Sequence, residues 1–166
     1  MKLIKFDMQD ETMRMALLPM YQVYEAEISE DEDALNEFYP KNSPEELLEH
    51  FEGYFGGKTT YICVIDGMYK GFVTFHLDCE ETPGYADGYR GWGHMSEIYT
   101  AKQSRGLGLG KVMVKKAEEE LGKLDIIGIH LMNLLTESKG FWKSLGYTDT
   151  GKVEPKEGGQ IFEKHL

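Results

Sequence analysis

The sequence predicts an α/β fold with α+β-type layers, in which helices flank a mixed, mostly antiparallel central sheet of about seven strands. Strand-like and helix-like periodicities alternate along the 166 residues. Two pairs of neighbouring strand segments are joined by short glycine turns, as in antiparallel hairpins. One strand leads through a glycine-rich loop and a helix into another strand, which is the order of a parallel crossover. Because no linker or repeat interrupts the chain, we expect a single domain over residues 1–166.

The N-terminal part of the chain predicts one strand and two helices. Residues 2–6 read as a strand. Residues 10–28 carry apolar side chains at three-to-four spacing and predict a helix that Pro19 should bend or split. A second helix is expected to begin at Ser43, a good N-cap followed by a proline and a capping-box glutamate, and to run to about residue 55.

The remaining elements alternate between strands and helices. Residues 60–66 and 70–77 are β-rich and meet at a Gly67 turn, which predicts a hairpin. Residues 80–93 are rich in turn formers, and 94–100 read as a strand. The elements expected after the glycine loop are a helix from Gly110 to Gly122, a strand at 125–132, a helix at 136–146, and two strands at 147–152 and 159–164.

Composition limits the class of protein. The chain has no apolar run long enough to cross a bilayer and no signal-peptide pattern at its start, so we expect a soluble, cytoplasmic protein without a membrane partner. A formal net charge of −11 argues against nucleic acid as the main partner. Cys63 and Cys79 have no metal-binding spacing, and Cys63 is expected to pack as a small hydrophobe rather than in a disulfide.

The charges are unevenly distributed. Residues 22–57 contain eleven acids and one lysine, whereas 101–117 contain five basic residues and no acid. A basic segment on an acidic protein indicates an anion site. The alternative is that Lys115 and Lys116 belong to a solvated helix face.

The glycine-rich stretch QSRGLGLGK at 103–111 is the strongest local signal. It lacks the spacing and the hydroxyl residue of a Walker A loop, and its G-x-G-x-G pattern fits a dinucleotide fingerprint poorly. Bare glycines that lead into a helix leave the first amides of that helix open to an anion, and Arg105 and Lys111 add positive charge. We therefore expect a metal-free pyrophosphate cradle; the alternative is a flexible turn that caps a helix.

Arg105, Gly108 and Gly110 resemble the fixed positions of the R/Q-x-x-G-x-G/A motif of the GNAT superfamily of N-acetyltransferases. The strand end IYT at 98–100 and the segment FWKSLGY at 141–147, which is similar to the family's F-Y-x-x-x-G-F, occur in matching order. The order of predicted elements matches as well, so the resemblance covers nearly the whole chain and implies a GNAT-like sheet.

The resemblance implies acetyl-CoA as the co-substrate, with its pyrophosphate on the amides of 105–111 and its pantetheine arm along the strand at 98–100. It also implies that the strand at 94–100 splays away from the strand at 125–132. The residues expected to contact the coenzyme are Ile98, Tyr99, Thr100, Arg105, Gly106, Leu107, Gly108, Leu109, Gly110, Lys111, Asn133 and Trp142.

Direct acetyl transfer to an amine needs a base for the ammonium proton and a route for the leaving thiolate. By resemblance, Glu97 is the candidate base, although strand alternation equally allows it to face outward. Trp142 stands where the family usually has a tyrosine, and an indole cannot give up a proton at working pH. Tyr147 is therefore the candidate acid, with another tyrosine, water or an unprotonated leaving group as alternatives. The reserve candidates for the base are His94, His130 and Tyr99.

These features predict an acetyl-CoA-dependent N-acetyltransferase that acts on a primary amine, either a small molecule or a peptide. Acids interleaved with Tyr21, Tyr24, Phe38 and Tyr39 suit a cationic acceptor, although an acidic run can also be a solvated face. The alternatives are a non-catalytic acyl-CoA-binding or regulatory module and, more distantly, a binder of another nucleotide. The segment from Tyr147 onward could pair with a second copy, so a homodimer is also open.

Overall fold

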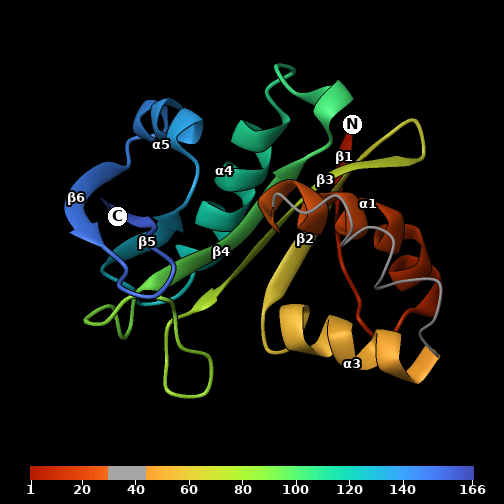
Figure 1. Ribbon diagram of the computed structural model, residues 1–166, viewed down its shortest axis with the longest axis horizontal. Helices are drawn as coiled ribbons and strands as arrows, with labels where there is room; N and C mark the ends of the chain where they lie inside the picture. Colours follow the sequence, from red (N-terminus) through yellow and green to blue (C-terminus); the bar gives the residue numbers. More distant parts are fainter. Residues whose placement is uncertain (30–43) are drawn as a thin grey trace.

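The computed structural model, which describes residues 1–29 and 44–166, contains a seven-stranded sheet with helices on both faces (Figure 1). The strand order is β1-β2-β3-β4-β5-β7-β6, and only the β4–β5 pair is parallel. The predicted fold class is confirmed. The strands are β1 (Lys2–Lys5), β2 (Thr59–Ile65), β3 (Met68–Leu77), β4 (Gly93–Thr100), β5 (Gly128–Asn133), β6 (Thr148–Val153) and β7 (Gln160–His165). The helices are α1 (Glu11–Ser29), α3 (Pro44–Phe55), α4 (Leu109–Leu121) and α5 (Lys139–Ser144), with the 3-10 turns η1 (Lys102–Ser104) and η2 (Thr136–Ser138).

Three element boundaries differ from the prediction. α1 continues through Pro19, so the expected split does not occur. β5 begins at Gly128, and Ile127 before it is 63% exposed because the chain is still turning away from α4 there. The helix expected at 136–146 consists of η2 followed by the short helix α5. The predicted cap Ser43 lies outside the described residues.

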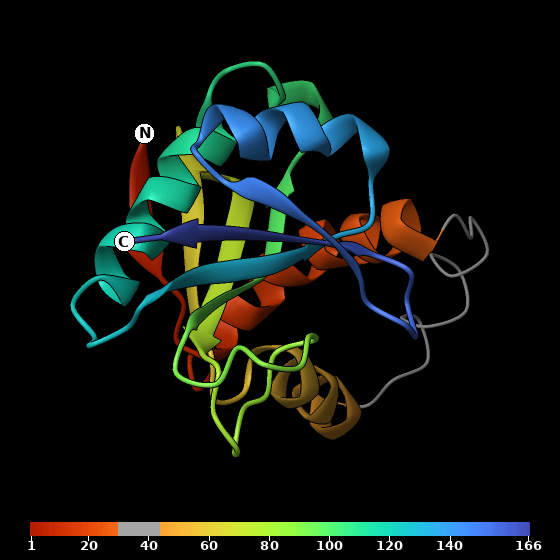
Figure 2. The same ribbon diagram turned by 90° about the vertical axis from the view of Figure 1, so that its left-hand side faces the viewer.

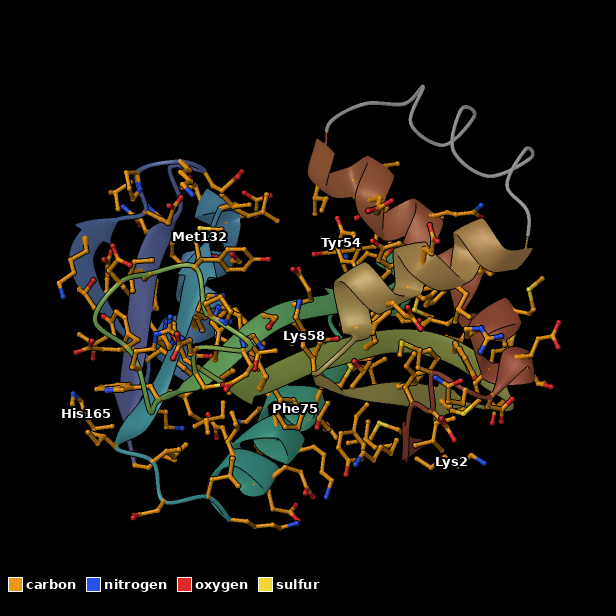
Figure 3. The ribbon with its side chains drawn as sticks, turned by 90° about the horizontal axis from the view of Figure 1, so that it is seen from below. Lys2, Tyr54, Lys58, Phe75, Met132 and His165 are labelled. Atoms are coloured by element: carbon orange, nitrogen blue, oxygen red, sulfur yellow. The ribbon has the colours of Figure 1, made fainter. Side chains whose placement is uncertain are left out.

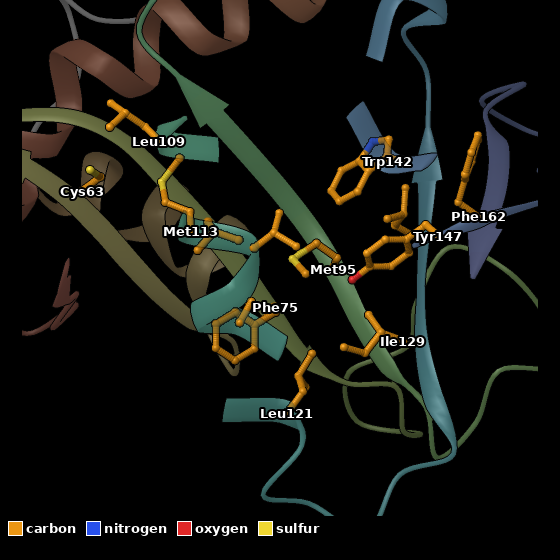
Figure 4. Packing of buried hydrophobic residues seen from close by; sticks show 14 residues of the cluster. Cys63, Phe75, Met95, Leu109, Met113, Leu121, Ile129, Trp142, Tyr147 and Phe162 are labelled. Carbon is orange, nitrogen blue, oxygen red and sulfur yellow. The ribbon is translucent and has the colours of Figure 1, made fainter. Parts of the chain in front are cut away.

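One face of the sheet packs against α4 and α5 (Figure 4). Met113 and Val114 of α4 are completely buried there, and Trp142 of α5 packs over the β5–β7 part of the sheet. Cys63 is buried in this cluster as a free thiol, which confirms that it packs as a small hydrophobe.

The opposite face packs against α1 and α3 and is strongly aromatic. Tyr21 of α1 meets Phe51 and Phe55 of α3, and Tyr24 of α1 meets Phe72 of β3. Burial of such rings supplies most of the stability of this layer, because each removes a large apolar area from water.

β4 and β5 diverge along their length, as Figures 1 and 2 show. Only two residue pairs join them, Gly93 with Ile129 and His94 with His130. Beyond His94 the strands separate, and the wedge between them widens toward η1 and the glycine loop. The predicted splay between these strands is therefore confirmed.

Candidate active site

The glycine loop lies between η1 and α4, at the wide end of the wedge between β4 and β5 (Figure 1). Gly106 and Gly108 both have φ of +78°, a conformation that glycine adopts without strain. A Cβ placed on either residue would meet no atom within 4 Å, so the surface of the loop is open.

In the part of the chain that the structure describes, the first turn of α4 has no side-chain cap for its amides. Gly108 is the N-cap residue and supplies no side-chain hydrogen bond, and Val112 N–H donates to the Gly108 carbonyl at 3.2 Å. The amides before Val112 therefore point out of the helix end, where the helix dipole favours an anion. The open surface and the uncapped helix fit a diphosphate that is held by backbone.

Gly110, the third glycine of the loop, has a packing role instead. A Cβ on Gly110 would lie 3.2 Å from the Phe141 ring, so this glycine lets α4 approach α5. Its neighbour Leu109 is buried in the core under α4, whereas Leu107 is 68% exposed. The glycines at 106 and 108 thus keep the loop bare, and the one at 110 serves helix packing.

The charges around the loop are partly neutralised within the protein. Arg105 forms an ion pair with Glu27 of α1, and its Nε donates to the Thr100 carbonyl at 3.0 Å. The Tyr99 hydroxyl donates to the same Glu27 carboxylate at 3.1 Å. Lys116 pairs with glutamates one turn further along α4, at 2.6 Å and 3.2 Å, as expected for a solvated helix face. Lys111 is exposed at the start of the helix.

The edge of β4 that faces the wedge carries backbone groups that no neighbouring strand of the described residues pairs with. Ala101 N–H donates to the Lys70 carbonyl of the β3 side at 3.0 Å. Peptide groups alternate in direction along a strand, so those of Ile98 and Thr100 point into the wedge. On this edge, no strand of the described residues pairs with β4 beyond His94, and of the peptide groups of Ile98 and Thr100 only the Thr100 carbonyl has a partner, Arg105 Nε. The wedge therefore offers backbone donors and acceptors beside the end of α4.

A β-bulge at Ser96 decides which way Glu97 faces. The β3–β4 register shifts there: Thr74 pairs with Glu97 and Phe75 pairs with Met95, so Ser96 has no partner residue on β3. As a result, Met95 and Ile98 pack on the α4 face, while Glu97 lies on the face covered by α1 and α3. Bulges often re-aim a side chain next to a functional site. The alternative that Glu97 is a simple outward residue is therefore not what the structure shows.

Glu97 is half-buried among hydrogen-bond donors. The Tyr24 hydroxyl donates to one of its carboxylate oxygens, and the Tyr85 hydroxyl donates to the other at 3.3 Å. Burial raises the pKa of Glu97, and the Tyr24 hydroxyl, the Lys58 ammonium and the Tyr85 hydroxyl oppose this effect. A carboxylate with a raised pKa inside a tyrosine cluster is a better proton acceptor than a free one.

The tyrosines around Glu97 line the α1 and α3 side of the site, where Figure 3 labels Tyr54 and Lys58. The Tyr21 hydroxyl donates to Glu25 at 2.6 Å, and the rings of Tyr21 and Tyr54 meet edge to face at 5.0 Å. Burial lowers the pKa of Lys58, which places a second titratable group near Glu97. The predicted aromatic residues Phe38 and Tyr39 lie outside the described residues.

The other predicted site residues lie farther inside the protein. Tyr147 is 2% exposed, its ring packs on Trp142 at 5.2 Å, and its hydroxyl has no hydrogen-bond partner within the described residues (Figure 4). Burial, aided by the nearby Glu118 carboxylate, raises the pKa of Tyr147. Asn133 holds the start of η2: its Nδ2 donates to the Leu135 carbonyl at 2.9 Å, and its Oδ1 accepts from the Ser138 hydroxyl. These residues support the α5 side of the wedge from behind.

Two of the reserve candidates, His94 and His130, form a buried stack at the narrow end of the wedge. Their rings are 4.6 Å apart, and His130 Nε2 lies 3.1 Å from Asp78 Oδ2. Burial lowers the pKa of both histidines, to about 4 for His130. They are neutral and enclosed beneath the loop at 78–92, as expected for core histidines.

Sequence analysis missed Tyr85, Ser96 and Lys58. Tyr85 lies in the turn-rich segment at 80–93, which has no periodicity that could indicate where its side chain goes. Lys58 follows α3 directly, and only the fold brings it near β4. Within residues 1–29 and 44–166, no helix is both long and apolar enough to cross a membrane, and no three His, Cys, Asp or Glu side chains are grouped to hold a metal ion.

Comparisons with known proteins find one matching family and several structures of similar fold. The model of the "Acetyltransferase (GNAT) family" matches residues 21–147. An aminoglycoside 6'-N-acetyltransferase complexed with coenzyme A has a similar structure, with a TM-score of 0.70 and 14% identity over 99% of this chain and 97% of that chain. A PaiA N-acetyltransferase from Thermoplasma acidophilum in complex with coenzyme A gives a TM-score of 0.64 at 16% identity, with both chains fully covered. A GNAT-family acetyltransferase from Staphylococcus aureus Mu50 gives 0.65 at 16% identity, over 99% and 98% of the two chains. No curated protein sequence matches the chain.

Proposed function

Because the chain belongs to the GNAT family of acetyltransferases, we propose that it transfers the acetyl group of acetyl-CoA directly to a primary amine. The observation that carries the proposal is the wedge between β4 and β5. It opens at the bare glycine loop, and the tyrosine-held carboxylate of Glu97 comes from the same strand, β4. The backbone edge that would bind the acetyl donor and the carboxylate that would accept the proton thus both belong to β4.

Bound acetyl-CoA would supply the activated acetyl thioester. The amides at the start of α4, with Gly106 and Gly108 leaving the surface bare, would hold its diphosphate. The peptide groups of Ile98 and Thr100 would bind the pantetheine arm, and an N–H of this edge would polarise the thioester carbonyl. Tyr99 turns its side chain toward α1, so its share in binding would be through its backbone.

Glu97 would take the proton from the acceptor ammonium, directly or through one water. Tyr24 and Tyr85 hold its two carboxylate oxygens, so the carboxylate stays oriented before an acceptor arrives. Tyr147 as the acid for the leaving thiolate would require its hydroxyl to leave the core cluster, since it is enclosed there. Departure of the thiolate without an enzyme acid requires no such movement.

A cationic acceptor is the class that the site chemistry favours. The carboxylates of Glu97 and Glu25, with several tyrosine rings, lie on the α1 and α3 side of the site. Carboxylates and π faces both attract an ammonium group. Lys58 would exclude an acceptor that presents a second cation close to it.

The test is an assay of CoA release from acetyl-CoA with a panel of neutral, monocationic and polycationic amines. We expect release that depends on the amine and is fastest with a cationic one. Calorimetric binding of acetyl-CoA without turnover on any amine would instead favour the non-catalytic acyl-CoA-binding module. Displacement of acetyl-CoA by ATP or NAD at comparable concentrations would favour a binder of another nucleotide.

A further inference from the structure

Ser96, the extra residue of the β4 bulge, is held by two buried histidines. Its Oγ lies 2.9 Å from Nδ1 of His76 and 3.4 Å from Nδ1 of His94. The two imidazoles are also in contact, since His94 Nδ1 lies 3.4 Å from His76 Nε2. His76 and His94 are direct partners across β3 and β4, so the three side chains form one cluster on the face that carries Glu97.

The buried histidines can keep a hydrogen bond to the Ser96 hydroxyl over a wide range of pH. Both histidines are buried, at 6% and 1% exposure, and burial lowers the pKa of His76 to about 4. Lys58 lowers this pKa further, whereas Asp78 and the backbone of the loop at 78–92 oppose the effect. A neutral imidazole has one donor and one acceptor, so His76 can serve Ser96 whichever nitrogen carries the proton.

The alternative to the bulged arrangement is regular pairing of β3 and β4 without an extra residue. A slip of one residue would exchange the faces of every side chain from Glu97 onward. Glu97 would then lie on the α4 face near Met95, where a carboxylate would be buried among apolar side chains. The Ser96–His76 hydrogen bond belongs to the bulged register, because regular pairing would move Ser96 to a new cross-strand position.

We propose that Ser96 and His76 are positioning residues for acetyl transfer: their hydrogen bond fixes the β4 bulge and thereby keeps the Glu97 carboxylate on the acceptor face. This inference rests on the proposed function, in which Glu97 accepts the ammonium proton. Neither residue needs to touch the coenzyme or the amine.

The experiment compares Ser96→Ala, Ser96→Thr and the control Thr150→Val. Thr150 lies on β6, at the far edge of the sheet from the bulge, and its Oγ1 donates to the Ile161 carbonyl at 2.9 Å. We expect Ser96→Ala to lower kcat about tenfold with KM for acetyl-CoA within about twofold of the wild type. Ser96→Thr keeps the hydroxyl and should restore most of kcat, and Thr150→Val should lower Tm without changing kcat.

A double-mutant cycle separates positioning from general damage. If Ser96 acts through Glu97, adding Ser96→Ala to Glu97→Gln causes no further loss of kcat. A wild-type kcat in Ser96→Ala, or an undiminished tenfold loss in the Glu97→Gln background, overturns the inference while acetyl transfer stands.

If the wild type releases no CoA with any amine, the proposed function fails, and the position of Glu97 must be tested without an activity assay. The test is then the pKa of Glu97, followed by NMR at its carboxyl carbon, because a carboxylate that has lost its hydrogen bond to Tyr24 has a different pKa. An unchanged Glu97 titration in Ser96→Ala overturns the inference in that case as well.

Discussion

The proposed coenzyme side and the proposed acceptor side of the site, called below the coenzyme side and the acceptor side, are built from different parts of the polypeptide. On the coenzyme side, one continuous segment supplies backbone amides, and glycines keep side chains out of the way. On the acceptor side, β4 supplies the Glu97 carboxylate, and α1 and the loop at 78–92 each send one hydroxyl to it, from Tyr24 and Tyr85. The first kind of site depends on local conformation, and the second depends on the whole fold. Substitutions on the coenzyme side should therefore change coenzyme binding, and substitutions on the acceptor side should change kcat.

The largest effect is expected from Gly108→Val. A valine at φ of +78° would be strained and would fill the open surface over the amides of α4. Loss of about three amide hydrogen bonds to a charged diphosphate should weaken acetyl-CoA binding on the order of a thousandfold, measured by calorimetry. Gly151→Val is the matched control, because Gly151 has φ of +74° and an equally open surface on β6. Equal losses of binding in both variants would show that strain, and not the cradle, is responsible.

Glu97→Gln should damage the acceptor side alone. An amide cannot accept the ammonium proton, so we expect kcat to fall roughly a hundredfold, the usual contribution of a general base. KM for acetyl-CoA should stay within about twofold, because Glu97 lies on the face opposite to α4. A rise in that KM with kcat unchanged would contradict the division into two sides.

The difference between a local and a fold-dependent site also explains which parts of the site could be predicted from the sequence. The bare glycine loop and the start of α4 were predictable because their signal lies within nine consecutive residues, and the strand–loop–helix order fixes where the helix begins. Glu97 was predictable only as one of two alternatives, because the Ser96 bulge that turns it inward leaves no mark in the alternation of 94–100. Tyr85 was not predictable, since its position depends on the path of a loop without periodicity. Arg105 was expected to face the coenzyme, but a glutamate 78 residues earlier in the chain pairs with it.

Acid should lower the free energy of unfolding through the buried histidines of the acceptor side. The pKa of His76 is about 4 in the folded protein, below the ordinary value of 6.5, so the unfolded chain takes up the proton first. Stability is therefore lost as the pH falls from about 6.5 toward about 4, and one such group accounts for roughly 2 kcal/mol at pH 5. Chemical denaturation at pH 7 and pH 5 should show a smaller loss in His76→Asn than in the wild type. His165→Asn, an exposed position on β7, should keep the wild-type loss; an equal loss in all three proteins would contradict this account.

Tyr24→Phe should move the acid limb of the pH–rate profile. Glu97 must be deprotonated to act, so activity falls as the pH drops through its pKa, which burial raises and the Tyr24 hydroxyl lowers. Removal of that hydroxyl raises the pKa further, and a hydrogen bond to a charged group corresponds to about one pH unit. The acid limb of kcat/KM should shift upward by about that amount. Tyr21→Phe, which removes a hydroxyl that donates to Glu25, should leave the limb in place; a shift to lower pH in Tyr24→Phe would contradict the assignment of Glu97 as the base.

The smallest effect is expected where the two sides meet, at the ion pair between Arg105 and Glu27. This pair is partly exposed and joins the coenzyme loop to α1, so it holds a positive charge away from the diphosphate site. Glu27→Gln should release that charge and lower KM for acetyl-CoA about two- to threefold at low salt, because exposed charges interact weakly. The gain should disappear at about 1 M salt, where the Debye length is roughly 3 Å. A higher KM in Glu27→Gln would mean that Glu27 holds Arg105 in a binding position, and the two sides of the site would then be coupled through α1.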